Sequence, residues 1–404
     1  MISVSEALER ILAGLSRLPA ECVGLDRALG RVLAEGVAAR RTQPPAAVSA
    51  MDGYAVRATD VETPPVTLRR IGEAPAGSAF EGVVKAGETV RIFTGGPVPD
   101  GADAIVIQEN VTAEGDRVTV RVGAAPGAHI RPAGLDFREG DEGLRPGRVL
   151  TARDIGLAAA MNVPWLMVSR RPRVALLATG DELVRPGEPM GPHQIVSSNS
   201  LAVAALVRAG GGEAIDLGIA LDERGSLEAL ADGAKGADML VTLGGASVGD
   251  RDLVRTVLGQ KGLELDFWRI AMRPGKPLVF GHIDGVPMLG LPGNPVSALV
   301  CGLVFLLPAI AAMLGLADPA VPLTDARLGR DLAANDERQD YLRARLTRDP
   351  AGARVATPFE RQDSSMLSRL AAADCLIVRA PHAPAARSGD PVEIIEFGGG
   401  PVGF

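Results

Sequence analysis

The chain has 404 residues, is 47% hydrophobic, 3% aromatic and 23% charged, and carries a formal net charge of −7. This length exceeds a single hydrophobic core and predicts about two to four domains, while the negative balance without a dense basic run excludes nucleic acid as an expected partner. The three cysteines, Cys22, Cys301 and Cys375, have neither pairing nor metal-ligand spacing. Their pattern favours a reduced compartment, and the first residues lack the character of a signal peptide, so we expect a cytoplasmic protein.

The first part of the chain predicts a helix followed by a small β-domain. Ser3 and Glu6 have capping-box spacing, and apolar residues recur at helical spacing over residues 7–15. Over residues 55–123 the pattern changes to short alternating runs separated by turns. These runs predict strands at 66–71, 104–107 and 118–122. Residues 151–161 again have a helical pattern.

Three continuous apolar runs then predict an α/β unit with a mostly parallel sheet. The runs cover residues 174–178, 239–243 and 287–291, and a loop of small or polar residues follows each of them. Continuous apolar runs suit strands that are buried on both faces, as in a parallel sheet. Because ligands bind outside the carboxyl ends of such strands, we expect the three loops to form one pocket. Backbone amides, hydroxyls and carboxylates in that pocket would suit a phosphorylated ligand held with a metal.

The first two loops carry candidate ligands. Glu182 follows the first run, within residues 179–183. The second loop offers two glycines for close backbone approach, a hydroxyl and two carboxylates suited to Mg²⁺, namely Gly244, Gly245, Ser247, Asp250 and Asp252. A helix cap or a solvated turn are the alternative interpretations. The spacing matches neither a Walker loop nor a dinucleotide-binding fingerprint.

A basic turn precedes the third run. It contains Arg269, Arg273 and Lys276, and Pro274 and Pro277 stiffen it. A solvent-exposed basic loop is the alternative, but the nearby acidic loops favour an oxyanion site. The four histidines are scattered, so a zinc site is not expected.

The segment 296–316 is uncharged and long enough to cross a bilayer. Pro308 interrupts it, and Asn294 as cap with Pro295 at the first helical position is typical of a soluble helix start. We therefore predict a buried helix and no membrane association. Upstream, Asn199 is expected to cap a helix over 200–208. The last part of the chain predicts strands at 340–346, 375–379 and 392–397.

Together these residues resemble the molybdopterin molybdenumtransferase family of the MoeA type, which also includes the gephyrin E-domain. The resemblance covers nearly the whole chain and depends on the order of seven short motifs. They are residues 49–55, residues 93–97 with 101–104, Ile130 and Arg131 with Gly134 and Asp136, residues 179–183, residues 244–249, residues 273–277, and residues 291–297.

The resemblance implies a multidomain α/β plus β architecture. Residues 1–46 and 131–171 would form an elongated, discontinuous domain that dimerises, with residues 47–130 inserted as the small β-domain. Residues 172–320 would form the α/β domain that binds molybdopterin, and residues 321–404 a β-barrel-like domain. The family forms homodimers in which the α/β domain of one subunit meets the β-domain of the other.

The implied activity is insertion of molybdate into adenylylated molybdopterin, which releases AMP and forms molybdenum cofactor. The enzyme must neutralise a phosphoanhydride and hold a tetrahedral dianion beside it. Mg²⁺ on Asp222 and Asp252 would serve the first task. The preceding adenylyltransferase and molybdoenzyme acceptors are further expected partners.

The resemblance also assigns site residues, which fall into three groups. The catalytic candidates are Asp52, Thr94, Asp136, Glu182 and Asp252. The substrate-binding candidates are Gly95, Gly180, Asp181, Gly244, Gly245, Ser247, Pro292, Gly293, Asn294 and Pro295. The molybdate-binding candidates are Arg273, Lys276, Arg343, Ser364 and Ser365.

The chain departs from the family pattern at three places. Arg269 and Arg273 stand where many members have Lys, and Leu135 precedes Asp136 where an acidic residue is usual. Two other functions stay open: a molybdopterin adenylyltransferase, which the additional domains disfavour, and a dimeric pterin carrier or scaffold with little catalysis. Residue types do not distinguish molybdate from tungstate, because the two oxyanions have similar size and charge.

Overall fold

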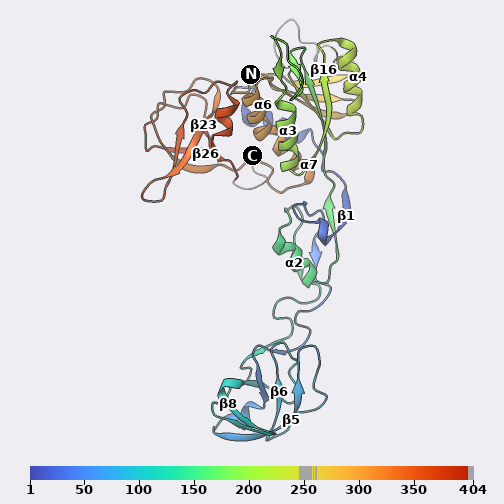
Figure 1. Cartoon of the computed structure of the whole chain (residues 1–404), viewed down its shortest axis with the longest axis vertical. Coiled ribbons are helices and arrows are strands. Elements are labelled where there is room, and N and C mark those ends of the chain that lie inside the picture. The colour runs from blue at the N-terminus through green and yellow to red at the C-terminus, as the bar shows by residue number, and fades with distance from the viewer. Residues whose placement is uncertain (245–256, 258, 260–261, 399–404) are drawn as a thin grey trace.

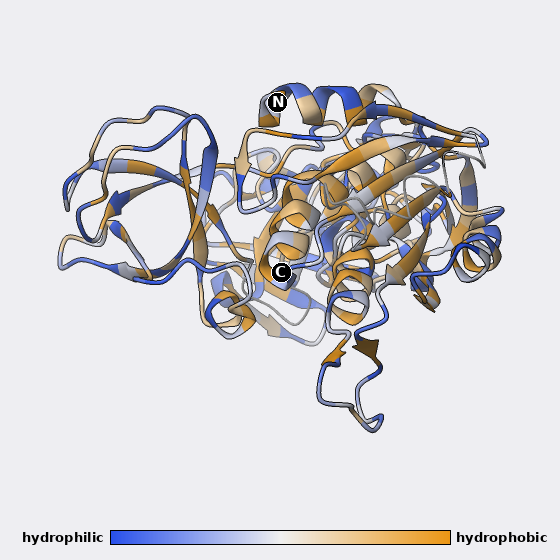
Figure 2. Ribbon diagram, turned by 90° about the horizontal axis from the view of Figure 1, so that it is seen from above, coloured by the Kyte–Doolittle hydropathy of each residue, from blue (hydrophilic) through white to orange (hydrophobic). Residues whose placement is uncertain are grey.

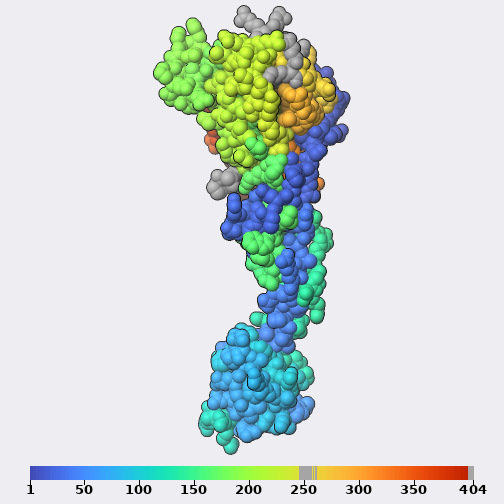
Figure 3. All heavy atoms as spheres, turned by 90° about the vertical axis from the view of Figure 1, so that its right-hand side faces the viewer, coloured from blue at the N-terminus to red at the C-terminus, as the bar shows by residue number. Residues whose placement is uncertain are grey.

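The computed structural model describes residues 1–244, 257, 259 and 262–398. A broad head lies at one end of the long axis, a narrow middle unit follows it, and a small β-domain lies at the far end (Figure 1). The same narrowing between the head and the β-domain is visible in the space-filling view (Figure 3). The chain starts in the head, runs to the far β-domain and returns.

One half of the head is the predicted α/β unit. Its sheet has the strand order β16-β13-β17-β21-β20-β18, parallel in its first four strands and antiparallel at β20 and β18. The strands are β13 (Arg173–Thr179), β16 (Glu213–Ala220), β17 (Met239–Leu243), β18 (Leu263–Phe267), β20 (Val279–Ile283) and β21 (Val286–Leu291). The three predicted apolar strands are β13, β17 and β21, which lie side by side. The mostly parallel sheet is therefore confirmed.

Helices cover both faces of this sheet. They are α1 (Val4–Ala13), α3 (Asn199–Ala209), α4 (Arg224–Ala231), α6 (Pro295–Cys301) and α7 (Leu307–Leu314), with a π-helical segment, Gly302–Leu306, joining α6 to α7. The continuous helix Pro295–Leu314 is apolar and long enough to cross a membrane, but 78% of its most apolar window is buried inside the protein. Its packing in the core of the head explains its composition, as the sequence predicted.

Two local assignments differ from the sequence predictions. Helix α3 begins at Asn199 with Ser198 at the cap position, and the Asn199 side-chain amide donates to the Gly293 carbonyl at 2.7 Å. The predicted cap at Asn199 is therefore wrong, because Asn199 is already the first residue of the helix and no side chain caps it. Helix α1 packs into the core of the α/β unit, so the predicted segment 1–46 is divided between the head and the middle unit.

The middle unit contains two short two-stranded sheets and one helix. Strand β1 (Ala20–Gly24) pairs with β12 (Trp165–Ser169), and β2 (Val37–Ala38) pairs with β11 (Glu142–Leu144). Helix α2 (Ala152–Ala160) begins with a capping box between Thr151 and Asp154. Arg170 fixes this unit to the head, because its two terminal nitrogens donate to both carboxylate oxygens of Asp238 at 2.6 and 2.9 Å.

The far β-domain is a six-stranded sheet of order β7-β4-β6-β5-β9-β8. Its strands are β4 (Gly53–Val56), β5 (Val66–Ala74), β6 (Glu88–Ile92), β7 (Ala104–Ile107), β8 (Val111–Glu114) and β9 (Arg117–Val120). Strands β3 (Val48–Ser49) and β10 (Ile130–Arg131) pair where the chain enters and leaves the domain. The inserted β-domain is confirmed.

The second half of the head is a closed barrel, in which the order β23-β24-β22-β26-β25 is closed by pairing of β25 with β23. Its elements are β22 (Thr324–Leu328), β23 (Gln339–Arg348), β24 (Arg354–Pro358), α8 (Leu367–Ala371), β25 (Cys375–Arg379) and β26 (Pro391–Glu396). Strand β19 (Met272–Arg273), which belongs to the α/β half in sequence, adds to the outer side of β23. From above, the barrel and the α/β half lie beside each other, and the most hydrophobic stretches follow their strands and helices (Figure 2).

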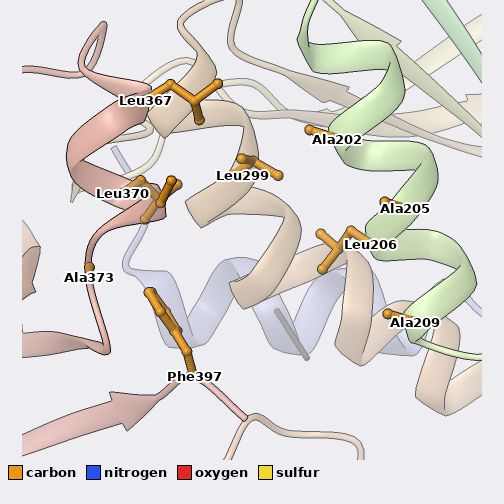
Figure 4. A pocket seen from close by; sticks show the side chains of 10 residues that line it. Ala202, Ala205, Leu206, Ala209, Leu299, Leu367, Leu370, Ala373 and Phe397 are labelled. Carbon is orange, nitrogen blue, oxygen red and sulfur yellow. The ribbon is translucent and has the colours of Figure 1, made fainter. Parts of the chain in front are cut away.

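An apolar groove of about 260 Å³ lies between the two halves of the head (Figure 4). Helices α3, α6 and α8 and the segment after β26 form its walls. Its lining is Ala202, Ala205, Leu206, Ala209, Leu299, Leu367, Leu370, Ala371, Ala373 and Phe397. None of these residues is a predicted site residue, so this groove is distinct from the site described below.

Candidate functional site

The predicted loops lie at the carboxyl ends of the parallel strands. From β13 the chain continues to β16 on one side, and it then returns to β17 on the other side of β13. Such a reversal of strand order is where ligands bind in open α/β sheets. The loops are in contact there: the Gly180 N–H donates to the Ala220 carbonyl, and the Gly244 N–H donates to the Leu291 carbonyl, both at 3.2 Å.

Two glycines in these loops have conformations that other residues rarely adopt. Gly180 has φ +145°, and a Cβ on it would lie 2.5 Å from a carboxylate oxygen of Glu182. Gly244 has φ +94°, and its Cβ would lie 2.9 Å from the Thr179 carbonyl oxygen. Both positions therefore need glycine, because the left-handed region disfavours a Cβ and the space is already filled. The two loops can approach each other and a ligand closely for this reason.

Negative charge concentrates between β13 and β16. The Asp222 N–H donates to the Asp181 carboxylate at 2.9 Å. Burial, followed by the charges of Asp181 and Glu182, raises the pKa of Asp222 above its ordinary value. Hard carboxylate oxygens of this kind suit Mg²⁺. Among the residues that the structure describes, no group of three or more His, Cys, Asp or Glu side chains is arranged to hold a metal.

Several predicted residues of the β17 loop lie outside the described residues. These are Gly245, Ser247, Asp250 and Asp252. Of the two predicted magnesium ligands, Asp222 and Asp252, the structure therefore describes only Asp222, whose N–H contacts the Asp181 carboxylate.

The variant Asp222→Asn should raise the free energy of unfolding near neutral pH by about 0.5 kcal/mol, a small gain because solvent screens this exposed carboxyl. The raised pKa means that the protonated group contributes stability, which is lost as pH rises through the folded-state pKa. The gain should therefore vanish as pH falls to about 4. Urea unfolding at the two pH values measures it. Glu223→Gln removes an adjacent charge and serves as the control, and an equal gain there would contradict the repulsion described.

The loop after β21 connects the α/β half to the barrel. Asn294 occupies the cap position of α6 without a side-chain capping bond. Its amide instead donates to the Ser364 hydroxyl at 2.9 Å, and the Val296 N–H donates to the Ser364 carbonyl at 3.1 Å. The structure therefore brings Ser364 of the barrel to the loop that was predicted to bind substrate, formed by Pro292, Gly293, Asn294 and Pro295.

Arg343 is 1% exposed and lies on the face of β23 that is turned away from the barrel interior, because Leu342, Ala344 and Leu346 pack in that interior. Its Nε donates to the Gln362 side-chain carbonyl at 3.0 Å, and a terminal nitrogen donates to the Asp363 carbonyl at 2.7 Å. Burial lowers the pKa of Arg343. The Ser365 hydroxyl in turn donates to the Asp363 carboxylate at 2.6 Å. Arg343 thus supports the segment that presents Ser364 and Ser365, although the sequence predicted it as a molybdate ligand.

Arg273 is also occupied. Its guanidinium donates to Asp336 at 3.0 Å, to Asn335 at 3.1 Å and, with a short contact, to Asp340. Lys276 is exposed, and its carbonyl accepts hydrogen bonds from the N–H groups of Ile270 and Leu278, both at 3.2 Å. Asn335, Asp336 and Asp340 were not predicted to belong to this region. The signal available was an acidic residue three positions before Arg343 on a predicted strand.

The β-domain residues form a separate cluster. One carboxylate oxygen of Asp52 accepts hydrogen bonds from the Thr94 N–H at 2.7 Å and the Thr94 hydroxyl at 2.8 Å. These bonds hold the pKa of Asp52 below its usual value. Gly95 follows with φ +82°. Asp136 is exposed on the connection to the middle unit, where its N–H donates to the Gln43 carbonyl at 3.0 Å.

The β-domain, which carries the Asp52 cluster, and the head, which carries the Glu182 loop, lie at opposite ends of the long axis of the molecule (Figure 1). The middle unit separates them. A single chain therefore does not combine these predicted catalytic residues in one site.

Known families match this chain over most of its length. Residues 2–162 match the MoeA N-terminal region (domain I and II), residues 175–312 match the probable molybdopterin binding domain, and residues 325–397 match the MoeA C-terminal region (domain IV). These matches follow the division into the long N-terminal part, the α/β half of the head and the barrel.

Curated relatives and solved structures agree with this. Molybdopterin molybdenumtransferase 2 of Mycobacterium tuberculosis is 40% identical over 80% of this chain and 82% of its own. Molybdopterin molybdenumtransferase of Nostoc is 38% identical over 81% of this chain and 77% of its own. The crystal structure of the molybdopterin biosynthesis MoeA protein from Pyrococcus horikoshii superposes with a TM-score of 0.86 at 30% identity, covering 99% of this chain and 100% of that one. The chain belongs to the molybdopterin molybdenumtransferase family of the MoeA type.

Proposed function

We propose that the protein inserts molybdate into adenylylated molybdopterin, releasing AMP and forming molybdenum cofactor in the cytoplasm. The observation that carries this proposal is the meeting of glycine loops, carboxylates and the Asn294–Ser364 contact at the point where the strand order reverses. Backbone amides of such loops suit phosphate groups, and the adjacent carboxylates suit a divalent cation. Family membership supports the same reaction.

In the proposed reaction, the residues of the site have separate roles. Gly180 and Gly244 allow the backbone to approach the phosphoanhydride, and Glu182 faces back over this turn. Lys276 supplies positive charge for the molybdate dianion, and Ser364 and Ser365 supply hydroxyl donors from the barrel. Asp222 would hold Mg²⁺ together with Asp252, which lies outside the described residues. The cation would offset charge on the phosphoanhydride as AMP leaves.

The Asp52 cluster requires a second copy of the chain. In a homodimer with two-fold symmetry, the β-domain of each copy would reach the strand-end loops of the other. Asp52, Thr94 and Gly95 would then complete the site beside Glu182. Asp136 lies on the connection that carries the β-domain and would contribute from there.

Release of AMP from adenylylated molybdopterin by the purified protein with Mg²⁺ tests the proposal. Release that depends on molybdate would support it, and parallel assays with tungstate would determine the preferred metal. Binding without AMP release at any molybdate concentration would favour a carrier or scaffold for the adenylyltransferase and the molybdoenzyme acceptors. Consumption of ATP would instead favour an adenylyltransferase.

Replacing Lys276 by Met should lower molybdate-dependent AMP release by about a hundredfold, because the substitution removes a cation from an oxyanion site. The side chain is exposed, so the thermal midpoint should change little. Lys235→Met, at an exposed ion pair with Asp232 on the far side of the α/β half, is the matched control and should keep full activity. Full activity of the Lys276→Met variant would show that Lys276 is not part of the oxyanion site.

A further inference from the structure

The barrel binds the basic turn of the α/β half through hydrogen bonds with Arg273. Its guanidinium contacts three acceptors on one barrel segment, namely Asn335, Asp336 and Asp340. We call these three residues with Arg273 the Arg273 clamp. A planar fork can reach several acceptors at once, whereas the single ammonium of Lys cannot reproduce that geometry.

Backbone contacts hold the same turn on both sides. Strand β19 adds to β23 with Arg273 opposite Asp340, and the Gln339 N–H donates to the Ala271 carbonyl at 2.9 Å. On the other side, Gly275 packs so closely on α6 that a Cβ there would lie 2.5 Å from the Cys301 sulfur. The turn is therefore wedged between the barrel and α6.

The carboxylates of the Arg273 clamp argue against binding of molybdate by Arg273. Asp340 is 4% exposed, and its Oδ1 atom has no hydrogen-bond partner within the described part of the chain. Its other oxygen depends on Arg273. A molybdate ion that drew Arg273 away would leave the buried Asp340 carboxylate without its hydrogen-bonded cation, which is unfavourable. Asp336 adds a further negative charge beside it.

We propose that Arg273 is a positioning residue through which the barrel fixes the basic turn, so that Lys276 and not Arg273 meets the molybdate ion. This inference rests on the proposed function. The clamp gives the barrel a role in oxyanion affinity, because it holds the turn that carries Lys276. It also explains the use of Arg at this position, because the fork satisfies three acceptors.

Asp340→Asn tests the proposal, because the two roles of Arg273 predict opposite signs. Loosening the clamp should raise the KM for molybdate about tenfold and change kcat less than about twofold, since a displaced group weakens binding geometry. If Arg273 were a molybdate ligand, the same substitution would free it and would lower the KM. Glu337→Gln removes one exposed charge from the same segment and should leave both constants unchanged. A KM for Asp340→Asn that is unchanged or lowered overturns the proposal.

Hydrogen exchange of residues 270–278 in the full chain without substrates provides a readout independent of turnover. Exchange should increase in Asp340→Asn and in Arg273→Lys, which keeps the charge but loses the fork. If exchange increases but the wild-type protein shows no molybdate-dependent turnover, the proposed function is wrong. The conclusion that the Arg273 clamp fixes the basic turn is then still supported. Unchanged exchange in both variants overturns the clamp. The thermal midpoint of each variant shows that the chain remains folded.

Discussion

An equimolar mixture of Asp52→Ala and Glu182→Ala chains should recover about a quarter of the wild-type turnover, whereas each variant alone should lose at least about a hundredfold. The β-domain with Asp52 and the head with Glu182 lie at opposite ends of the long axis (Figure 1), so the two residues would meet only if two copies combine. Random pairing makes about half of the dimers mixed, and each mixed dimer has one site with both residues intact. Mixing after brief dissociation, followed by the AMP release assay, measures this recovery.

Two results would contradict the shared site. Mixed chains that stay as inactive as the separate variants would show that Asp52 and Glu182 do not act in one site built from two copies. Full activity of the Asp52→Ala variant alone would remove the β-domain from the site. A mixture of Asp52→Ala with Thr94→Ala is the matched control, because both changes fall on the same half and no pairing restores it.

The variant Gly180→Ala should lose about a hundredfold in turnover and about 1–3 kcal/mol in the free energy of unfolding. A Cβ there would occupy the position of the Glu182 carboxylate, at 2.5 Å, in a backbone conformation with φ +145°. Glu182 must then move away from the strand ends. Turnover and urea unfolding measured on the same preparation separate the two effects.

Gly187→Ala provides the control for strain. Gly187 also has a left-handed backbone, with φ +87°, but a Cβ there would meet nothing within 4 Å. We expect a loss of stability from backbone strain and near-normal turnover. Equal losses of turnover in both variants would show that the Gly180 effect is general strain and not displacement of Glu182.

Runs of apolar residues predicted much of the fold, because the burial of many strands requires such runs. Strands β7, β17 and β25 begin and end at the residues where their apolar runs begin and end. The strand-end loops followed from a general rule of parallel sheets, so the region of Glu182 and Gly244 could be found without the structure. The pairing of β19 with β23 could not be predicted from the sequence, because nothing near residues 272–273 specifies a partner strand in a later domain.

Two of the predicted molybdate ligands, Arg343 and Arg273, have protein partners in the structure. Arg343 has the residue type of an anion ligand, but alternation along β23 places it with Tyr341 on the buried face that packs toward the α/β half. Arg273 likewise has three barrel partners that a sequence without the β19–β23 pairing does not reveal. Residue type predicts which groups can bind an anion, and tertiary contacts decide which of them are free to do so.

The narrow middle unit makes the molecule a lever. Rotation of a rigid arm moves its tip in proportion to its length, so a small angular change where Arg170 meets Asp238 sweeps the distant β-domain through a large displacement. In the proposed dimer, the angle at this junction would therefore limit how often Asp52 reaches the strand-end loops of the other copy. The stiffness of the middle unit would then affect turnover through residues that do not contact the substrate.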